Sequence, residues 1–210
     1  MKVVVARQPL RQILRWMQYA LFAAAAAMLA YCGLVLVDSW TFQRHAGAQL
    51  DRLLREQPAM RGTRVTAQPG SARNSIPAIT RGLIGRIEIP RLGLSAMVME
   101  GTTNTVLRRA AGHIAGTALP GQPGNVGIAG HRDTFFRPLR NIRRNDIITL
   151  TTLMGEYRYR VVSTRVVGPH DVAVLDPASK KEVLTLVTCY PFYFIGSAPS
   201  RFIVRAEIVS

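Results

Sequence analysis

Cysteine is almost absent from this chain, whose 210 residues contain only Cys32 and Cys189. Together with scattered histidines, these two residues lack the three or four converging donors that a zinc site needs, so we predict neither a metal site nor a cofactor. An acidic cluster is also lacking, which leaves calcium dependence open. The serine hydrolase motif G-x-S-x-G is missing as well, which argues against that class of enzyme.

Acidic residues are scarce too, since 12 Asp and Glu face 27 Lys and Arg, for a net charge of +15. A basic surface suits nucleic acid, acidic lipid headgroups or an anionic wall polymer. The chain contains no zinc-finger spacing, no RNP-like stretch and no basic zipper. We therefore predict that it has no nucleic-acid partner.

Charge is missing from one long run, the 22 residues Trp16–Val37, which is long enough to cross a bilayer as a helix. Four basic residues precede the run and Asp38 follows it. The positive-inside rule therefore places residues 1–15 in the cytoplasm and the rest of the chain outside. We predict a cytoplasmic basic tail (1–15) and a transmembrane signal-anchor (16–37) in the cytoplasmic membrane.

Two alternatives to an uncleaved anchor stay open. A cleavable signal peptide has a shorter apolar region, of about 7–15 residues. The stretch LAYC is faintly similar to a lipoprotein cleavage box, but Tyr31 stands before Cys32, where a small residue is expected. Because Cys32 falls inside the predicted span and Cys189 outside it, we expect no disulfide between them.

Residues 38–80 are predicted to form a helical stalk and a flexible linker. Leu50, Leu53 and Leu54 share one face of a helix that Pro58 is expected to stop. Residues 58–80 hold three prolines, two glycines and many small polar residues without an apolar period. That composition is typical of a linker.

From Gly82 onward, short apolar or alternating runs are separated by turn residues. They predict one or two strands in 85–101, a short helix in 102–114, and strands in 125–129, 146–153, 156–167, 183–189 and 201–209. Six to eight short strands with little helix predict an all-β domain that forms a closed or nearly closed barrel.

Cys189 ends one of these apolar strands, where an inert core cysteine is the first interpretation to weigh. A catalytic cysteine needs a base or a cation beside it, because the thiolate is the nucleophilic form. His131 is the best-placed base, since it directly follows an apolar strand and a glycine. His170 is more typical of a solvated turn, and His113 of a helix end.

Acyl transfer also needs a group that stabilises the oxyanion. Arg201 begins the strand that follows the Cys189 strand, so pairing of these two strands would bring its guanidinium to the same end. With 24 arginines in the chain, an incidental arginine is the competing interpretation.

Three segments resemble, in order, those of the sortase family of cysteine transpeptidases. TLVTCYPFYFIGSAPSRFIVRA is similar to the sortase signature, with Arg201 twelve residues after Cys189. ALPGQPGNVGIAGHRDTFFRPL is similar to the histidine segment, and IGRIEIPRLGLSAMVMEGT to the start of the catalytic domain. The resemblance covers about residues 82–210 and is greatest to the class D-like branch.

The resemblance implies an eight-stranded sortase-type β-barrel with short helices in residues 81–210, after the one transmembrane helix. It implies that Cys189 is the nucleophile, His131 the general acid and base, and Arg201 the group that binds the substrate backbone and oxyanion. Thr188 would contact the bound peptide. Sortases cleave a C-terminal sorting signal of LPxTG type between Thr and Gly through a thioacyl enzyme. An amine of a cell-wall precursor or a pilin lysine then takes the acyl group.

Two neighbouring features are interpreted through the same resemblance. The family needs no carboxylate to orient its histidine, so Asp133 is assigned to a turn or to a salt bridge with a nearby arginine. The loop Phe192–Gly196 is expected to form a wall of the substrate groove.

Two other functions stay open. An L,D-transpeptidase-like cross-linker of the cell wall also uses Cys and His, although its usual S-x-G-C-x-R/N motif is missing here. A non-catalytic, membrane-anchored β-barrel adaptor would leave Cys189 inert.

Overall fold

A computed structural model of the chain describes residues 8–61, 82–176, 182–194 and 196–209. The chain divides into two compact units, Met1–Thr41 and Phe42–Ser210. The long helix α1 (Gln8–Arg61) begins in the first unit and ends in the second. Residues 62–80 of the predicted linker lie outside the described residues.

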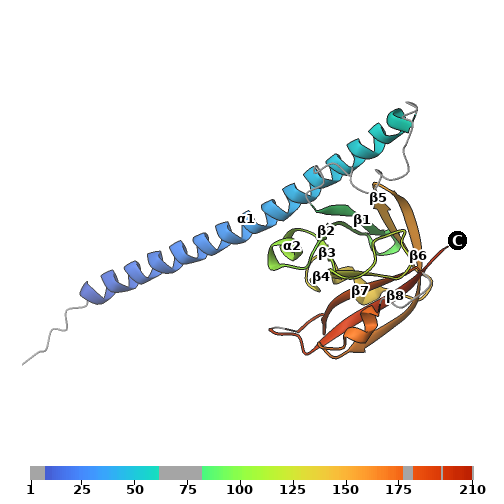
Figure 1. Cartoon of the computed structure of the whole chain (residues 1–210). Helices are drawn as coiled ribbons and strands as arrows, with labels where there is room; N and C mark the ends of the chain where they lie inside the picture. The colour runs from blue at the N-terminus through green and yellow to red at the C-terminus, as the bar shows by residue number, and fades with distance from the viewer. Residues whose placement is uncertain (1–7, 62–81, 177–181, 195, 210) are drawn as a thin grey trace, which may run out of the picture. The chain divides into compact units, whose positions relative to one another are not determined.

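The second unit is a closed β-barrel (Figure 1). Its strands are β1 (Leu83–Ile89), β2 (Leu94–Glu100), β3 (Ala111–His113), β4 (Asn125–Gly130), β5 (Ile147–Thr152), β6 (Gly155–Val167), β7 (Val183–Tyr190) and β8 (Ser200–Ile208). Between them lie α2 (Asn104–Arg109) and the 3-10 helices η2 (Pro90–Leu92), η3 (Arg137–Asn141) and η4 (Val172–Leu175). The strand order around the barrel is β1-β2-β3-β4-β7-β8-β6-β5. The predicted eight-stranded, all-β barrel with short helices is confirmed.

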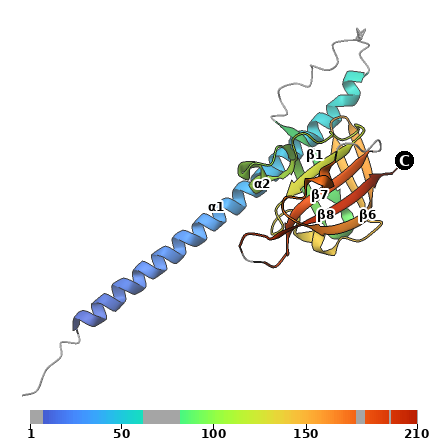
Figure 2. The ribbon, with the colours of Figure 1, turned by 60° about the horizontal axis from the view of Figure 1, so that its bottom comes forward.

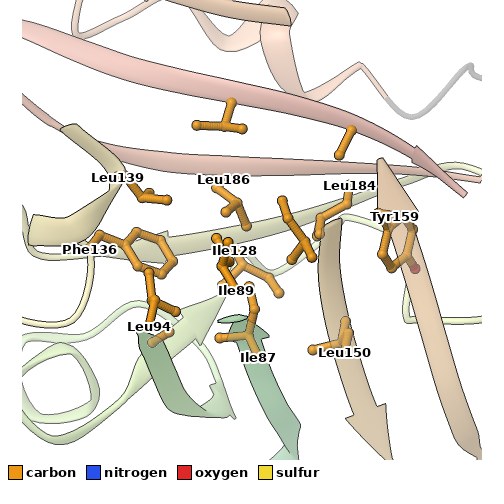
Figure 3. Close-up of a cluster of buried hydrophobic side chains, with 14 of the residues drawn as sticks. Ile87, Ile89, Leu94, Ile128, Phe136, Leu139, Leu150, Tyr159, Leu184 and Leu186 are labelled. Atoms are coloured by element: carbon orange, nitrogen blue, oxygen red, sulfur yellow. The ribbon is translucent and has the colours of Figure 1, made fainter. Parts of the chain in front are cut away.

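The strands β4 and β7 pair in parallel and are almost wholly buried. Parallel strands are typically covered on both faces. One face lines the barrel core, which includes Ile128, Leu184 and Leu186 and is shown in Figure 3. On the other face, Asn125 donates a hydrogen bond of 3.1 Å to the Val174 carbonyl of η4. Because the two strands are parallel, their carboxyl ends lie at the same rim of the barrel.

The turn between β1 and β2 contains Pro90 and Gly93. Pro90 begins η2, and Gly93 takes a left-handed conformation with φ of 61°. The Gly93 N–H donates to the Pro90 carbonyl at 3.0 Å. Glycine adopts such a φ without a steric penalty, so the strand break is built into these two residues.

The predicted helix over 102–114 is too long. The start of the helix is capped by the Thr103 hydroxyl, which accepts a hydrogen bond from a backbone N–H in the first turn. However, α2 ends at Arg109, and residues 111–113 form β3, which puts His113 in a strand instead of at a helix end. The reason is tertiary, because β3 pairs with both β2 and β4.

Helix α1 is long and apolar enough to cross a membrane, the one such helix among the described residues. The apolar stretch lies within Arg11–Glu56, and none of its most apolar 18 residues is buried in the protein. This finding agrees with the predicted N-terminal transmembrane helix. Cys32 lies in this helix, and neither it nor Cys189 forms a disulfide, as expected.

The predicted helix stop at Pro58 is wrong, because α1 runs on to Arg61. A proline within a helix removes one backbone hydrogen bond and crowds the carbonyl four residues earlier. The helix ends three residues after Pro58.

The last turns of α1 pack on the barrel within the second unit. Leu50, on the predicted apolar face, is fully buried against Met97 of β2 and Ala110. Gln43 donates from its amide to the Arg109 carbonyl at 2.5 Å and accepts from the Met97 N–H at 2.9 Å. The periodicity predicted the apolar face, but the surface that covers it emerges only in three dimensions.

Asp146 joins β5 to the turn between β1 and β2. Its carboxylate, only 8% exposed as a residue, accepts two hydrogen bonds from Arg91 and one of 2.7 Å from the Arg143 N–H. The hydrogen bond from Arg91 holds the pKa of Asp146 below its ordinary value, although burial opposes this. Arg91 also donates to the Asn141 carbonyl at 2.7 Å, so one ion pair fastens three segments.

We predict that Asp146→Asn lowers the free energy of unfolding at pH 7 by about 1.5–3 kcal/mol, because Arg91 loses a charged acceptor. The lowered pKa of Asp146 means that its carboxylate stabilises the fold above about pH 4, and that this contribution is lost as pH falls through the folded-state pKa. Urea unfolding of both proteins should show a difference that shrinks from pH 7 to about pH 3. A constant difference would contradict the ion-pair argument.

Candidate active site

Cys189 and Arg201 lie directly opposite each other on β7 and β8. The two strands pair antiparallel and run side by side in Figure 2. Directly opposite residues project from the same face of a sheet, with Cβ atoms about 4.5–5.5 Å apart. The pairing of these two strands, expected from the sequence, is therefore observed. It brings Arg201, which carries the guanidinium, next to Cys189, which carries the thiol.

His131 reaches the same rim from β4. The last register pair between β4 and β7 is Gly130 with Thr188, so the next residues along the two strands are His131 and Cys189. Neighbouring strands lie about 4.8 Å apart. His131, Cys189 and Arg201 thus stand at the ends of three adjacent strands, with Cys189 in the middle.

A buried hydrogen bond from Thr188 of β7 to β4 links the two strands at this rim. The Thr188 hydroxyl donates to the Gly130 carbonyl at 2.7 Å, and the residue is only 2% exposed. Leaving such a buried hydroxyl without a partner costs about 1–3 kcal/mol, so the bond helps to hold the register at the strand ends. The predicted contact of Thr188 with a bound peptide stays a prediction.

The turn after His131 is held by Phe136. The Phe136 N–H donates to the His131 carbonyl at 3.1 Å, and its fully buried ring lies against Gly130. A Cβ at Gly130 would lie 2.7 Å from that ring, so only glycine allows this approach. The packing fixes the strand end from which His131 projects.

The three side chains remain accessible. Cys189 and His131 are each partly exposed, and neither side chain makes a hydrogen bond or ion pair within the described part of the chain. Arg201 donates from Nη1 to the carbonyls of Ala198, at 3.3 Å, and Ser200, at 3.1 Å. Its Nε and Nη2 make no bond to any residue in the described ranges and can bind another acceptor.

The other two barrel histidines differ from His131 in their surroundings. His113 is 3% exposed, and its ring nitrogens lie 2.9 Å from the Glu100 carboxylate and 2.9 Å from the Ala118 carbonyl. With both nitrogens occupied, His113 is a structural residue. His170 is exposed in a turn, as predicted.

No carboxylate or metal cluster supports His131 in the part of the chain that is described. Asp133 is exposed in the turn after His131, so the turn alternative is observed, and no described arginine forms an ion pair with it. No group of three or more His, Cys, Asp or Glu side chains in the described ranges could hold a metal ion. Within the described residues, the rim presents a thiol, an imidazole and a guanidinium.

Aromatic rings flank the strand ends. Tyr190, Phe192 and Phe202 form a cluster with ring centroids 5.3–6.2 Å apart, and Phe192 and Phe202 also pack against the core. The β7–β8 loop follows, comprising residues 191–199, of which all but residue 195 are described. Its role as a groove wall stays a prediction.

Arg132 is a site residue that the sequence analysis missed. Its guanidinium donates to backbone carbonyls of the β7–β8 loop, and so connects the segment after His131 to the segment after Cys189. The one signal in the sequence was its place next to His131, which is weak in a chain with 24 arginines.

We predict that Gly130→Ala lowers the free energy of unfolding by about 1–3 kcal/mol, because the new Cβ overlaps the Phe136 ring. Gly168→Ala is the matched control, since a Cβ at Gly168 meets nothing within 4 Å. Urea unfolding should therefore separate the two variants. Equal stability of both would contradict the packing argument.

The family model for the Sortase domain matches residues 87–209. The match begins within β1 and continues past the end of β8, so it spans the barrel. His131, Cys189 and Arg201 all fall inside it.

Individual relatives agree with this match. Sortase D of Bacillus subtilis (strain 168) is 28% identical over 190 residues, which is 90% of this chain and 96% of that protein. A Sortase D5 transpeptidase of Clostridium perfringens is 32% identical over 61% of this chain and 79% of that structure, with a TM-score of 0.56. Sortase A of Corynebacterium diphtheriae is 25% identical, with a TM-score of 0.57 over 85% of this chain and 93% of that structure. With its barrel, its strand-end cysteine and these relatives, the chain belongs to the sortase family of cysteine transpeptidases.

Proposed function

We propose that this chain is a membrane-anchored sortase that cleaves a C-terminal sorting signal of LPxTG type between Thr and Gly and transfers the protein to an amine. The proposal is carried by one observation, the convergence of His131, Cys189 and Arg201 on neighbouring strand ends. In a sortase-family chain, a base, a nucleophile and a cation at one rim suit acyl transfer.

Cys189 is the proposed nucleophile. Its thiolate attacks the carbonyl carbon of the signal's threonine, which forms a C–S bond and an oxyanion. The C–N bond to glycine then breaks, and His131 donates a proton to the departing amine. The protein to be anchored is now held on Cys189 as a thioester.

The second half of the reaction reverses these roles. The acceptor amine attacks the thioester carbonyl and His131 takes a proton from its nitrogen. The C–S bond breaks, an amide forms, and the Cys189 thiolate is regenerated. Every group that reacts belongs to the chain or to its two substrates, so we propose that the reaction needs no cofactor.

Arg201 is proposed to bind the substrate backbone and to stabilise the oxyanion. It lies opposite Cys189, and its Nη1 donates hydrogen bonds to the carbonyls of Ala198 and Ser200, which precede it in the chain. Charge-assisted hydrogen bonds are shorter and stronger than neutral ones. A guanidinium already fixed on one side loses less freedom when its remaining donors bind a developing negative charge.

The proposed partners are proteins with the C-terminal signal and an amine donor, either a peptidoglycan precursor or a pilin lysine. The proposed location is the cytoplasmic membrane, crossed once by the apolar part of α1. The four basic residues before the span favour a cytoplasmic tail at residues 1–15 and a catalytic domain on the outer side.

We expect Cys189→Ala to lower cleavage of an LPxTG-type peptide to less than about one-thousandth of the wild-type rate, because the nucleophile is removed. His131→Ala should lower it by about 10²–10⁴-fold, and Arg201→Ala by about 10²–10³-fold. Mass spectrometry of the released glycine fragment, with the full chain in detergent, measures all three variants.

Arg205→Ala is the matched control, since this arginine lies on the same strand at a register position farther from Cys189, opposite Thr185. It should keep the wild-type rate. Cleavage by Cys189→Ala as fast as by wild type would refute the proposal. Cross-linked muropeptides in place of signal cleavage would favour an L,D-transpeptidase, and an unreactive thiol at Cys189 would favour an adaptor.

The orientation is tested by cysteine labelling in intact cells. Both variants are made in a Cys32→Ala, Cys189→Ala background, which removes the two native thiols. A membrane-impermeant maleimide should then label a cysteine introduced by Arg144→Cys, on the exposed surface of the barrel, without lysis. The variant Gln12→Cys, in the predicted cytoplasmic tail, should be labelled only after lysis. The reverse pattern would contradict the proposed topology.

A further inference from the structure

Arg132 binds three backbone carbonyls of the β7–β8 loop. Its Nη1 donates to the Pro191 carbonyl at 3.1 Å, and its Nη2 donates to the carbonyls of Phe194, at 2.7 Å, and Gly196, at 2.9 Å. The guanidinium carbon also lies 5.9 Å from the centre of the Phe194 ring, within the range of a cation–π contact. One side chain thus holds the loop at three backbone positions.

These bonds join the two halves of the site. Arg132 directly follows His131, whereas the loop runs from the strand of Cys189 to the strand of Arg201. Carbonyls in such a loop need a partner other than a neighbouring strand. A guanidinium presents five N–H donors in a rigid, planar fork, so it can serve several carbonyls at once and fix their relative positions.

A second arginine from the same segment touches the loop. The Arg140 guanidinium of η3 lies 5.6 Å from the centre of the Tyr193 ring. Tyr193 and Phe194 are 77% and 45% exposed, four and five residues after Cys189. Exposed apolar surface beside a reactive group is typical of a binding site. The two arginines therefore contact the exposed rings of a loop that begins two residues after Cys189.

We propose that Arg132 is a positioning residue, which clamps the β7–β8 loop so that its exposed aromatic rings contact the sorting signal while the scissile carbonyl lies at Cys189. The inference rests on the proposed function, because it requires a peptide substrate at this rim. It assigns Arg132 no chemical step. Loss of the clamp therefore affects substrate binding more than the reacting groups.

Kinetics of the full chain in detergent test the positioning role. For Arg132→Ala, the KM for an LPxTG-type peptide should rise about tenfold while kcat falls less than about threefold, because a loosened loop weakens binding and leaves the reacting groups in place. A variant that only folds less well would lower the apparent kcat at an unchanged KM. That result would overturn the proposal.

Two further variants distinguish the hydrogen bonds that the Arg132 guanidinium makes to the loop from the effect of its positive charge. Arg132→Lys keeps the positive charge, but one ammonium group cannot reproduce the fork, so its KM should also rise several-fold. A wild-type KM for the lysine variant would overturn the clamp. Arg137→Ala is the matched control, since the guanidinium of this exposed arginine of the same segment forms no hydrogen bond or ion pair with any described residue. It should retain the wild-type KM.

Amide hydrogen exchange measures whether Arg132 holds the β7–β8 loop when no substrate is present. Amides in 190–200 should exchange at least about fivefold faster in Arg132→Ala than in wild type, while those of β5 remain unchanged. Unchanged exchange in 190–200 would overturn the clamp, and faster exchange with an unchanged KM would overturn the positioning role. If the wild-type chain cleaves no LPxTG-type peptide, the proposed function fails, and exchange still decides whether Arg132 holds the loop.

Discussion

The parallel pairing of β4 with β7 is the constraint on which the site depends. Parallel strands carry their carboxyl ends to one rim, so His131 and Cys189 become neighbours although they are 58 positions apart in the sequence. The pairing is stabilised by apolar side chains that fill the barrel, and the bond from Thr188 to the Gly130 carbonyl holds the register at its end. The antiparallel pairing of β7 with β8 then adds Arg201 on the other side of the thiol.

Arginine serves several purposes in this barrel, and the partner of each guanidinium sets its role. Arg91 neutralises the buried Asp146 and holds three segments together. Arg201 faces Cys189 with two donor groups not engaged by the described residues. Arg132 donates hydrogen bonds to backbone carbonyls of the β7–β8 loop. Composition shows only an excess of positive charge, because the same side chain suits an ion pair, an oxyanion or a backbone clamp.

Two of the differences between expectation and structure have a common origin. The periodicity of residues 102–114 favoured a helix, but residues 111–113 gain two neighbouring strands and become β3. That change takes His113 from a helix end into a buried set of hydrogen bonds. The apolar face that includes Leu50 was correctly expected, yet the pattern did not specify that it would cover β2. In each case a partner distant in sequence decided the outcome.

The sequence by itself determined the long apolar span, the alternation that makes short strands, and the thiol and imidazole that follow buried strands, because these features depend on residues close together in the chain. The tertiary structure alone decided that His113 is buried and hydrogen-bonded, that Arg201 lies directly opposite Cys189 in the strand register, and that Arg132 holds the β7–β8 loop. Those choices depend on strand register and on contacts between distant segments. Local periodicity does not specify this register or these contacts, because the same short pattern can pack against many different neighbours.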